Sequence, residues 1–409
     1  MTKFDVCIIG GGAAGLAAAA SLSEQLKVCI FEKNEIPGRK LMATGGGRCN
    51  ITNDACKGKK ATLDFFASIG LETHMDEAGR FYPYTNKAAD VQKALLRAQG
   101  PNVTSYCGYE VETVVADCAG DGSRGFLVTA KAPSTAKASA NAKAAAGAGD
   151  PAGPKLTVRA DCVLLATGGK AAPQYGTTGD GYRIAKSFGH HVNKVYPILA
   201  PVECVYDPED ETFFRKVKGI RAKAEVTLLK DVEPVPGVKP ERGELQFTED
   251  GLSGICIFDL TPYITAEEGE AVPKAMERYS ISVDLAPDFS EEALRKRTTC
   301  RGLLTEELAD ATDEEMERRG CGPELIKDWR FTVKNVKGWR YAQCTAGGID
   351  TGEIDPETME SRLVPGLYFA GEVIDVQGPC GGFNLQNAWE TGRKAAAAIN
   401  KKIIKTNNE

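Results

Sequence analysis

The start of the chain alternates two apolar runs with a glycine turn and an alanine-rich stretch. Residues 4–9 are mostly apolar and end at a glycine, a pattern typical of a short buried strand. Residues 16–22, mostly alanine and leucine, favour a helix. A second apolar run at residues 28–31 ends in Glu32 and predicts a second buried strand. This stretch therefore predicts a strand, a helix and a strand, the repeating unit of α/β folds.

Similar patterns continue along the first half of the chain. We expect helices at 62–69, 87–98 and 182–188, and strands at 111–115, 126–129 and 161–169, the last ending in small residues. Residues 79–84 are interpreted as a loop with aromatic anchors. Residues 132–154 are of low complexity and rich in alanine, and they predict a mobile loop between two strands, with a short helix as the alternative.

The pattern changes at Pro197 and changes back near residue 341. Short strands at 203–206, 224–229 and 244–247, split by turns, predict a small antiparallel barrel, and the charged residues 290–319 predict a small helical part. After them, a strand ends at Gly371-Glu372, and a second glycine loop precedes a helix at 388–399. We therefore expect a first domain at 1–196, an inserted substrate domain at 197–340, and the closing part of the first domain at 341–409.

Composition narrows the possible functions. Lys and Arg number 50 against 56 Asp and Glu, and the resulting charge of −6 argues against a nucleic-acid surface. The 13 cysteines are scattered without metal-type pairs and there are only three histidines, so we expect no metal site and no disulfide framework. No signal-peptide pattern and no membrane-length apolar run occurs, so a cytoplasmic protein without a membrane segment is expected.

The glycine turn has the chemistry of a dinucleotide site. Gly10, Gly12 and Gly15 give the spacing G-x-G-x-x-G between a strand and a helix, where free backbone N–H groups can bind a pyrophosphate. Glu32 follows at the distance expected of the carboxylate that accepts from the ribose hydroxyls. Because a carboxylate repels a 2′-phosphate, we expect FAD or NAD here rather than NADP. A glycine turn that binds nothing is the alternative.

The segment that follows is unusually rich in glycine and basic residues. Residues 33–53 predict a long polar loop in which Arg39, Lys40 and Arg48 can offset a pyrophosphate or a reduced, anionic flavin. The alternative is a flexible surface loop. The helix after the second glycine loop would place its positive end at the far end of the cofactor, where it could stabilise negative charge on a reduced ring.

Three segments together resemble the BaiN-like family of bacterial flavoproteins, the NAD(P)/FAD-dependent oxidoreductases. They are residues 10–50, with the run Gly45-Gly46-Gly47-Arg48-Cys49-Asn50, residues 248–254, and residues 345–386. The resemblance implies an α/β, glutathione-reductase-like Rossmann domain that binds FAD, interrupted by an inserted domain with a small β-barrel and a helical part.

The resemblance also implies which residues hold the FAD. Gly10, Gly12, Ala13, Ala14 and Gly15 would hold the pyrophosphate, and Glu32, followed by Lys33, the adenosine ribose. Arg39, Lys40, Thr44, Gly47, Arg48, Cys49 and Asn50 would line the flavin side, and Val111 would meet the adenine through its backbone. Thr167 and Gly168 would lie beside the cofactor, Gly371, Glu372 and Asp375 near the ribityl chain and pyrophosphate, and Gly382, Phe383, Asn384 and Leu385 over the ring.

The sequence leaves more than one reaction open. No second G-x-G-x-x-G lies between a predicted strand and a predicted helix, so NAD(P)H, as a transient donor, would visit the flavin face that the substrate uses. The favoured hypothesis is NAD(P)H-driven reduction of a conjugated C=C bond in a small enone or dienone, with steroids or bile acids implied by the resemblance. The alternatives are a small-amine oxidase and a non-catalytic flavin-binding protein that serves a partner.

The sequence says less about further groups and partners. FAD is expected to be tightly but non-covalently bound, and no obligate protein partner is evident. Cys49 and Cys380 are the thiols considered for catalysis, although packing beside FAD is the favoured role of each.

Overall fold

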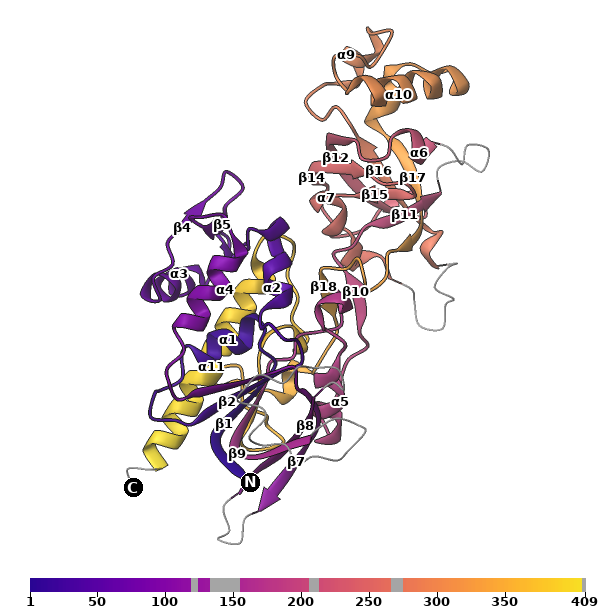
Figure 1. Ribbon diagram of the computed structural model, residues 1–409. Helices are drawn as coiled ribbons and strands as arrows, with labels where there is room; N and C mark the ends of the chain where they lie inside the picture. The colour runs from indigo at the N-terminus through magenta and orange to yellow at the C-terminus, as the bar shows by residue number, and fades with distance from the viewer. Residues whose placement is uncertain (119–123, 133–154, 206–212, 266–274, 407–409) are drawn as a thin grey trace. The chain divides into compact units, whose positions relative to one another are not determined.

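The computed structural model describes residues 1–118, 124–132, 155–205, 213–265 and 275–406 (Figure 1). The low-complexity segment expected to be a loop lies, except for Ala132, outside these ranges. The chain divides into two compact units, Met1–Tyr196 with Cys344–Glu409, and Pro197–Gln343. Strands β10 (Tyr196–Ile198) and β18 (Cys344–Ala346) lie where the chain passes from one unit to the other.

A largely parallel sheet forms the centre of the first unit. Strand β1 (Thr2–Ile9) pairs in parallel with β2 (Val28–Glu32) on one side and with β9 (Lys155–Leu165) on the other. The sheet continues in parallel to β6 (Val103–Cys107) beyond β2, and β19 (Leu367–Phe369) pairs in parallel with β9. Strands β8 (Arg124–Lys131) and β7 (Glu110–Cys118) add an antiparallel hairpin beside β9. The expected Rossmann-type α/β domain is confirmed.

Helices cover this sheet and form a second apolar cluster. Helix α1 (Ala13–Ala19) packs closely on α11 (Phe383–Thr406) (Figure 1). The close approach depends on Gly392, where a Cβ atom would overlap the carbonyl oxygen of Ala14. The helices expected at 62–69, 87–98 and 182–188 are confirmed as α3 (Lys59–Ser68), α4 (Ala88–Arg97) and α5 (Asp180–Ser187). Burial of the apolar side chains of α1, α3, α4 and α11 in one cluster stabilises this arrangement.

Three local expectations are wrong. Residues 79–84 are not a loop, since β5 (Arg80–Pro83) pairs with both β3 (Thr52–Asn53) and β4 (Thr73–Met75). The loop expected at 33–53 contains a short helix, α2 (Arg39–Ala43), followed by a 3-10 turn. Helix α11 begins at Phe383 and not at Ala388, directly after two glycines with positive φ. In each case pairing or packing with distant residues decides the local structure.

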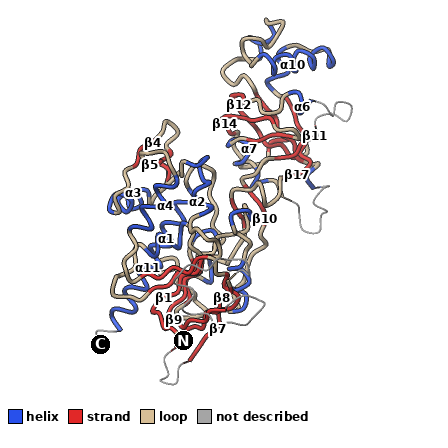
Figure 2. Tube along the Cα trace, in the orientation of Figure 1, coloured by secondary structure: helices blue, strands red, loops and turns tan. Residues whose placement is uncertain are grey.

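The second unit is a closed antiparallel barrel with a helical part, as expected (Figure 2). Six strands close the ring by pairing of the last with the first: β12 (Arg221–Lys230), β14 (Glu241–Phe247), β15 (Gly251–Ser253), β11 (Val202–Val205), β17 (Trp329–Val336) and β16 (Tyr279–Asp284). The two-residue strand β13 (Glu233–Pro234) extends β12. The fully buried rings of Phe247, Trp329 and Phe331 fill the core.

Short helices complete the second unit. They are α6 (Phe213–Lys216), α7 (Ile255–Phe258), α9 (Glu291–Arg295) and α10 (Glu306–Arg319). Within the described residues, 3-10 turns lie in this unit at Thr261–Tyr263 and Pro323–Lys327, and in the first unit at Thr44–Gly47, Pro173–Tyr175, Thr351–Glu353 and Gly371–Val373. Across the described ranges, no helix combines the length and the apolar character needed to cross a membrane.

Candidate functional site

The glycine turn between β1 and α1 has two glycines that the fold needs and one that leaves room for a ligand. A Cβ atom at Gly10, whose φ is +106°, would overlap the end of β9, and one at Gly15 would overlap the carbonyl oxygen of Gly10. A Cβ atom at Gly12 would meet no atom within 4 Å. The first helical hydrogen bond runs from Leu16 N–H to the Gly12 carbonyl, so the N–H groups of Ala13, Ala14 and Gly15 remain available to an anion.

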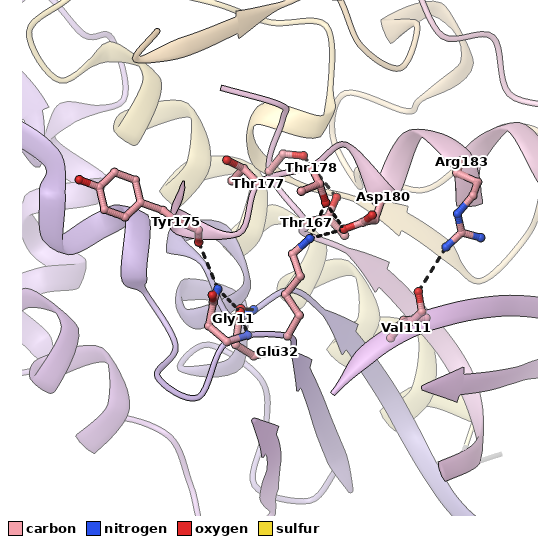
Figure 3. Close-up of polar contacts among 12 residues, drawn as sticks. Gly11, Glu32, Val111, Thr167, Tyr175, Thr177, Thr178, Asp180 and Arg183 are labelled. Atoms are coloured by element: carbon pink, nitrogen blue, oxygen red, sulfur yellow. Dashed lines mark hydrogen bonds and ion pairs between the residues drawn. The ribbon is translucent and has the colours of Figure 1, made fainter. Parts of the chain in front are cut away.

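Glu32 is fixed beside this turn. Its side chain is buried, and its Oε2 accepts from the Gly11 N–H at 2.8 Å (Figure 3). Its Oε1 accepts from both the backbone and the side-chain amide of Asn34, each at 2.7 Å. Because a carboxylate has about four acceptor sites and three are used, Glu32 is held in place with capacity left on Oε2 for one hydroxyl group. Asn34, which also donates to the Tyr175 carbonyl, is a site residue that the sequence analysis missed.

Two basic residues near Glu32, Lys33 and Arg183, form contacts within the protein. Lys33 donates to the Thr178 hydroxyl and pairs with Asp180, at the start of α5 (Figure 3). Arg183 donates to the carbonyls of Val111 at 3.3 Å and Glu112 at 2.6 Å, next to the irregular pairing between Val111 and Thr113. Lys33 therefore forms an ion pair within the protein. Arg183 holds the backbone of Val111 in place, and the sequence analysis did not identify Arg183 as a site residue.

Contacts continue from the glycine turn toward β19. Gly371, with φ +76°, approaches the first turn of α1 so closely that a Cβ atom there would lie 3.0 Å from that of Ala14. The next residue, Glu372, pairs through Oε2 with Lys40 Nζ at 2.7 Å, and its Oε1 accepts from the Thr345 N–H at 3.0 Å. Lys40 is thus neutralised by Glu372, a pairing that the sequence analysis did not predict. Asp375 accepts from the Asn193 amide at 2.8 Å.

The far end of the site lies where the loop at 44–53 meets the start of α11. Asn53 donates to the Gly381 carbonyl at 2.9 Å, and the Thr52 hydroxyl donates to Gln386 at 2.7 Å. A Cβ atom at Gly382 would lie 2.7 Å from the Asn50 side-chain oxygen. Asn50 is 8% exposed, and its Oδ1 has no hydrogen-bond partner in the described part of the chain.

The unpaired Asn50 oxygen marks a position where a ligand could donate a hydrogen bond. A buried acceptor without a donor costs about 1–3 kcal/mol, so Asn50 Oδ1, one of four such buried side-chain atoms among the described residues, is a candidate for a hydrogen bond from a ligand. The first hydrogen bond of α11 runs from Gln386 to Gly382, which leaves the N–H groups of Phe383, Asn384 and Leu385 available nearby. The Asn384 side chain itself holds Gly378, through bonds of 2.8 and 2.9 Å.

Most of the predicted site residues therefore form a continuous row in the first unit. Contacts connect Glu32 to the glycine turn, the turn to Gly371, and Lys40 to Glu372, while Asn50 meets Gly382. Thr167 and Gly168 follow β9 directly, and Gly168 has a φ of +71°. The row has a buried carboxylate at one end, free backbone amides next to it and an unpaired acceptor at the other end. Such a row fits an extended dinucleotide whose last ring offers a hydrogen-bond donor.

The two thiols considered for catalysis differ in their surroundings. Cys49 is fully buried, and burial raises the pKa of its thiol to about 12 despite a hydrogen bond with Thr44. Cys380 is partly exposed in the loop before Gly381. A thiol with so high a pKa is neither a nucleophile nor a ready proton donor, so the surroundings of Cys49 favour packing. Among the described residues, no three His, Cys, Asp or Glu side chains are grouped as metal ligands would be.

We expect Cys49 to resist alkylation in the folded protein. At pH 8, iodoacetamide should modify Cys49 at least about 100-fold more slowly than the exposed Cys118, because its thiolate is scarce and shielded. Peptide mass spectrometry after timed labelling measures both rates. Labelling of Cys49 at the rate of Cys118 would contradict the buried position.

Comparison with known proteins gives a family match along almost the whole chain. The family described as "HI0933-like protein Rossmann domain" matches residues 4–61 and 57–398. The 3-dehydro-bile acid delta(4,6)-reductase of Clostridium scindens is 32% identical over 447 residues, covering 96% of this chain and 98% of that protein. The ribosomal RNA dihydrouridine synthase of Escherichia coli is 27% identical over 434 residues, covering 96% of each.

Solved structures share the fold. The 3-ketosteroid-delta4-(5alpha)-dehydrogenase of Rhodococcus jostii superposes with a TM-score of 0.51 at 15% identity, covering 98% of this chain and 97% of that one. Quinol fumarate reductase FrdA of Escherichia coli gives a TM-score of 0.50 at 16% identity, covering 99% of this chain and 72% of that one. At these identities the similarity describes architecture alone.

Proposed function

Because the chain belongs to the HI0933-like Rossmann-domain family, we propose that it is an FAD-dependent oxidoreductase that reduces a carbon–carbon double bond conjugated to a carbonyl group. The observation that carries the FAD assignment is the pair of features at the two ends of the row. Glu32 suits a ribose with free hydroxyls, and the unpaired Asn50 oxygen suits a ring with an N–H donor. An isoalloxazine ring has such a donor at N3.

Named residues would hold the cofactor along this row. Glu32 would hold the adenosine ribose, and the N–H groups of Ala13 to Gly15 would hold the pyrophosphate. Asn50 and the first turn of α11 would hold the flavin ring, and the positive helix end would stabilise negative charge there. When bound, the flavin supplies the hydride chemistry. The many backbone contacts available support tight, non-covalent binding.

NAD(P)H is proposed as the transient electron donor. Only Gly10 to Gly15 has the G-x-G-x-x-G spacing between a strand and a helix, since the same spacing at residues 120–125 leads into strand β8. The lack of a second strand–turn–helix unit of this kind supports a donor that alternates with the substrate at one flavin face. The choice between NADH and NADPH is left to experiment.

The relatives' names support the reaction class. A 3-dehydro bile acid carries a ketone, and a delta(4,6)-reductase acts on double bonds that such a ketone can conjugate. Dihydrouridine is uridine with a saturated C5–C6 bond, which in uridine is conjugated to the C4 carbonyl. Since the relative named for a small molecule is the more similar of these two, we propose a small, flat enone as the substrate. A uracil base in RNA is the second candidate.

Anaerobic mixing tests this function. Purified protein is mixed with NADH or NADPH while the flavin band near about 450 nm is followed. We expect one nucleotide to bleach the band, and a steroid enone to restore it without oxygen. Restoration by a uridine-containing ribosomal RNA fragment alone would establish the second candidate. Reduction by a small amine and by neither nucleotide would indicate an oxidase and contradict the proposal.

A further inference from the structure

Arg48 carries a guanidinium group that the fold holds in place without neutralising it. The group lies over the Tyr82 ring, 4.6 Å from its centroid, and its Nε donates to the Gly45 carbonyl at 3.3 Å. Tyr82 is buried in β5, between two neighbouring strands. The aromatic face is therefore a rigid support, and stacking restricts a side chain that would otherwise be mobile in solvent.

Arg48 also lacks an acidic partner. In the described ranges no carboxylate lies within 4 Å of it, and its two terminal nitrogens have no acceptor. Two other basic residues of the first unit do have a carboxylate partner, since Lys40 pairs with Glu372 and Arg80 pairs with Asp76. Arg39, also without a carboxylate, contacts Asn34 at the adenosine end of the row. At the Asn50 end, Arg48 is the basic residue whose charge remains available to a ligand.

The backbone places Arg48 at an open position beside that end. Cβ atoms at Gly46 and Gly47 would meet no atom within 4 Å. Cys49 then adopts a φ of +63° and donates its N–H to the Thr44 carbonyl at 3.0 Å, which turns the chain back. As a result Asn50 is buried while Arg48, two residues earlier, stays exposed. The exposed guanidinium and the buried Asn50 therefore belong to the same tight turn of the chain.

We propose that Arg48 binds the carbonyl oxygen of the substrate and stabilises the negative charge that develops there. This inference rests on the function proposed above. The β-carbon of the conjugated system receives a hydride from the reduced cofactor, and the electrons of the double bond move onto the carbonyl oxygen. A proton from solvent then reaches the α-carbon while the carbonyl reforms. A fixed cation at the position of the developing charge lowers this barrier.

The residue type suits this role. A guanidinium group stays protonated at all relevant pH values, so Arg48 contributes charge and the N–H donors of its two terminal nitrogens without giving up a proton. An enone oxygen and the O4 of a uracil ring develop the same charge, so the role holds for both candidate substrates.

The test measures ionisation of a bound anion mimic, and it needs neither a reductant nor turnover. The probes are 6-cyano-2-naphthol, a planar phenol, and 5-nitrouridine, whose spectra each report loss of a proton. Each is titrated with flavin-loaded wild-type protein and with R48M, R48K and R97M across pH. Arg97 is an exposed arginine in the last turn of α4 and serves as the matched control.

We expect the wild-type protein to bind the ionised form of one probe at least about tenfold more tightly than the neutral form. R48M should abolish this preference, R48K should restore part of it, and R97M should leave it unchanged. Preference for the ionised naphthol indicates a small-molecule substrate, and preference for the ionised nitrouridine indicates an RNA base.

The inference is wrong if the ionisation preference survives in R48M, or if neither probe binds to the wild-type protein. It is also wrong if R48M changes the flavin affinity or the reduction potential but leaves probe ionisation unchanged. That result would show that Arg48 serves the cofactor. Loss of FAD binding or of reduction by NAD(P)H in the wild-type protein would contradict the proposed function instead, so the two failures are distinguishable.

Discussion

A Gly12→Val variant should fold as the wild-type protein does and purify without FAD. A Cβ atom at Gly12 would have no protein atom within 4 Å, so the fold leaves room for a side chain to begin there. The same space lies beside the free N–H groups of the turn, where the pyrophosphate is proposed to bind. We expect FAD affinity to fall by at least about 100-fold, equivalent to about 3 kcal/mol. Flavin absorbance after reconstitution and circular dichroism of the apoprotein measure the two effects.

Gly15→Val is the matched control, because it places the same side chain three residues later. There the Cβ atom would overlap the Gly10 carbonyl oxygen and push α1 away from β1. We expect this variant to lose about 3 kcal/mol or more of folding stability, whether or not FAD is present. A yellow, FAD-loaded Gly12→Val protein would refute the placement of the pyrophosphate, and equal destabilisation by both substitutions would show that Gly12 is structural.

Local patterns predict the two strands around the glycine turn. The apolar runs at 4–9 and 28–31 correspond to β1 and β2, which pair with Val6 opposite Val28. The spacing from Gly12 to Glu32 predicts a carboxylate for the ribose, and the structure adds that this carboxylate accepts from the Gly11 N–H. Strands that are buried on both faces leave a continuous apolar pattern, and this pattern is why such strands are recognisable without distant information.

Interactions between distant segments were not predictable in the same way. The residues around Lys40 in the sequence give no sign of its partner Glu372. From the sequence alone, Arg39, Lys40 and Arg48 are therefore equally available to an anion, whereas in the structure Lys40 forms an ion pair. The strand at Arg80–Pro83 forms because β3 and β4 supply partners, while its own glycine and proline neighbours suggest a loop. Asn34 and Arg183 act through single hydrogen bonds, which leave no pattern in the sequence.

The start of α11 shows the same limit at the flavin end. The glycine loop before it was recognised, but the helix was placed five residues late because Phe383 to Gln386 carry no strong helix signal. Tertiary contacts supply what local propensity lacks, through Trp389 bonded to the Ile51 carbonyl and Gln386 bonded to Thr52. The earlier start brings the free amides of the first turn to Gly382 and Asn50, and so it determines the geometry of the proposed ring site.

Removing the Asn50 side chain should change apoprotein and holoprotein in opposite directions. Without a ligand, Asn50→Ala eliminates a buried, unpaired acceptor and should leave the apoprotein equally or more stable, by up to about 1 kcal/mol. With FAD, the variant lacks the acceptor proposed for the ring N–H, and we expect affinity to fall about tenfold to 100-fold. Thermal unfolding with and without FAD, together with fluorescence titration of the flavin, separates the two effects.

Asn53→Ala is the control for this prediction, because Asn53 lies on the same loop but already has a partner. Its amide donates to the Gly381 carbonyl, so its loss should destabilise the apoprotein by about 1 kcal/mol and weaken FAD binding only as far as the loop relaxes. The two asparagines therefore differ in the sign of their effect on the empty protein. If Asn50→Ala destabilises the apoprotein as Asn53→Ala does and binds FAD with unchanged affinity, the Asn50 oxygen is not a ligand contact, and the ring must lie elsewhere along the row.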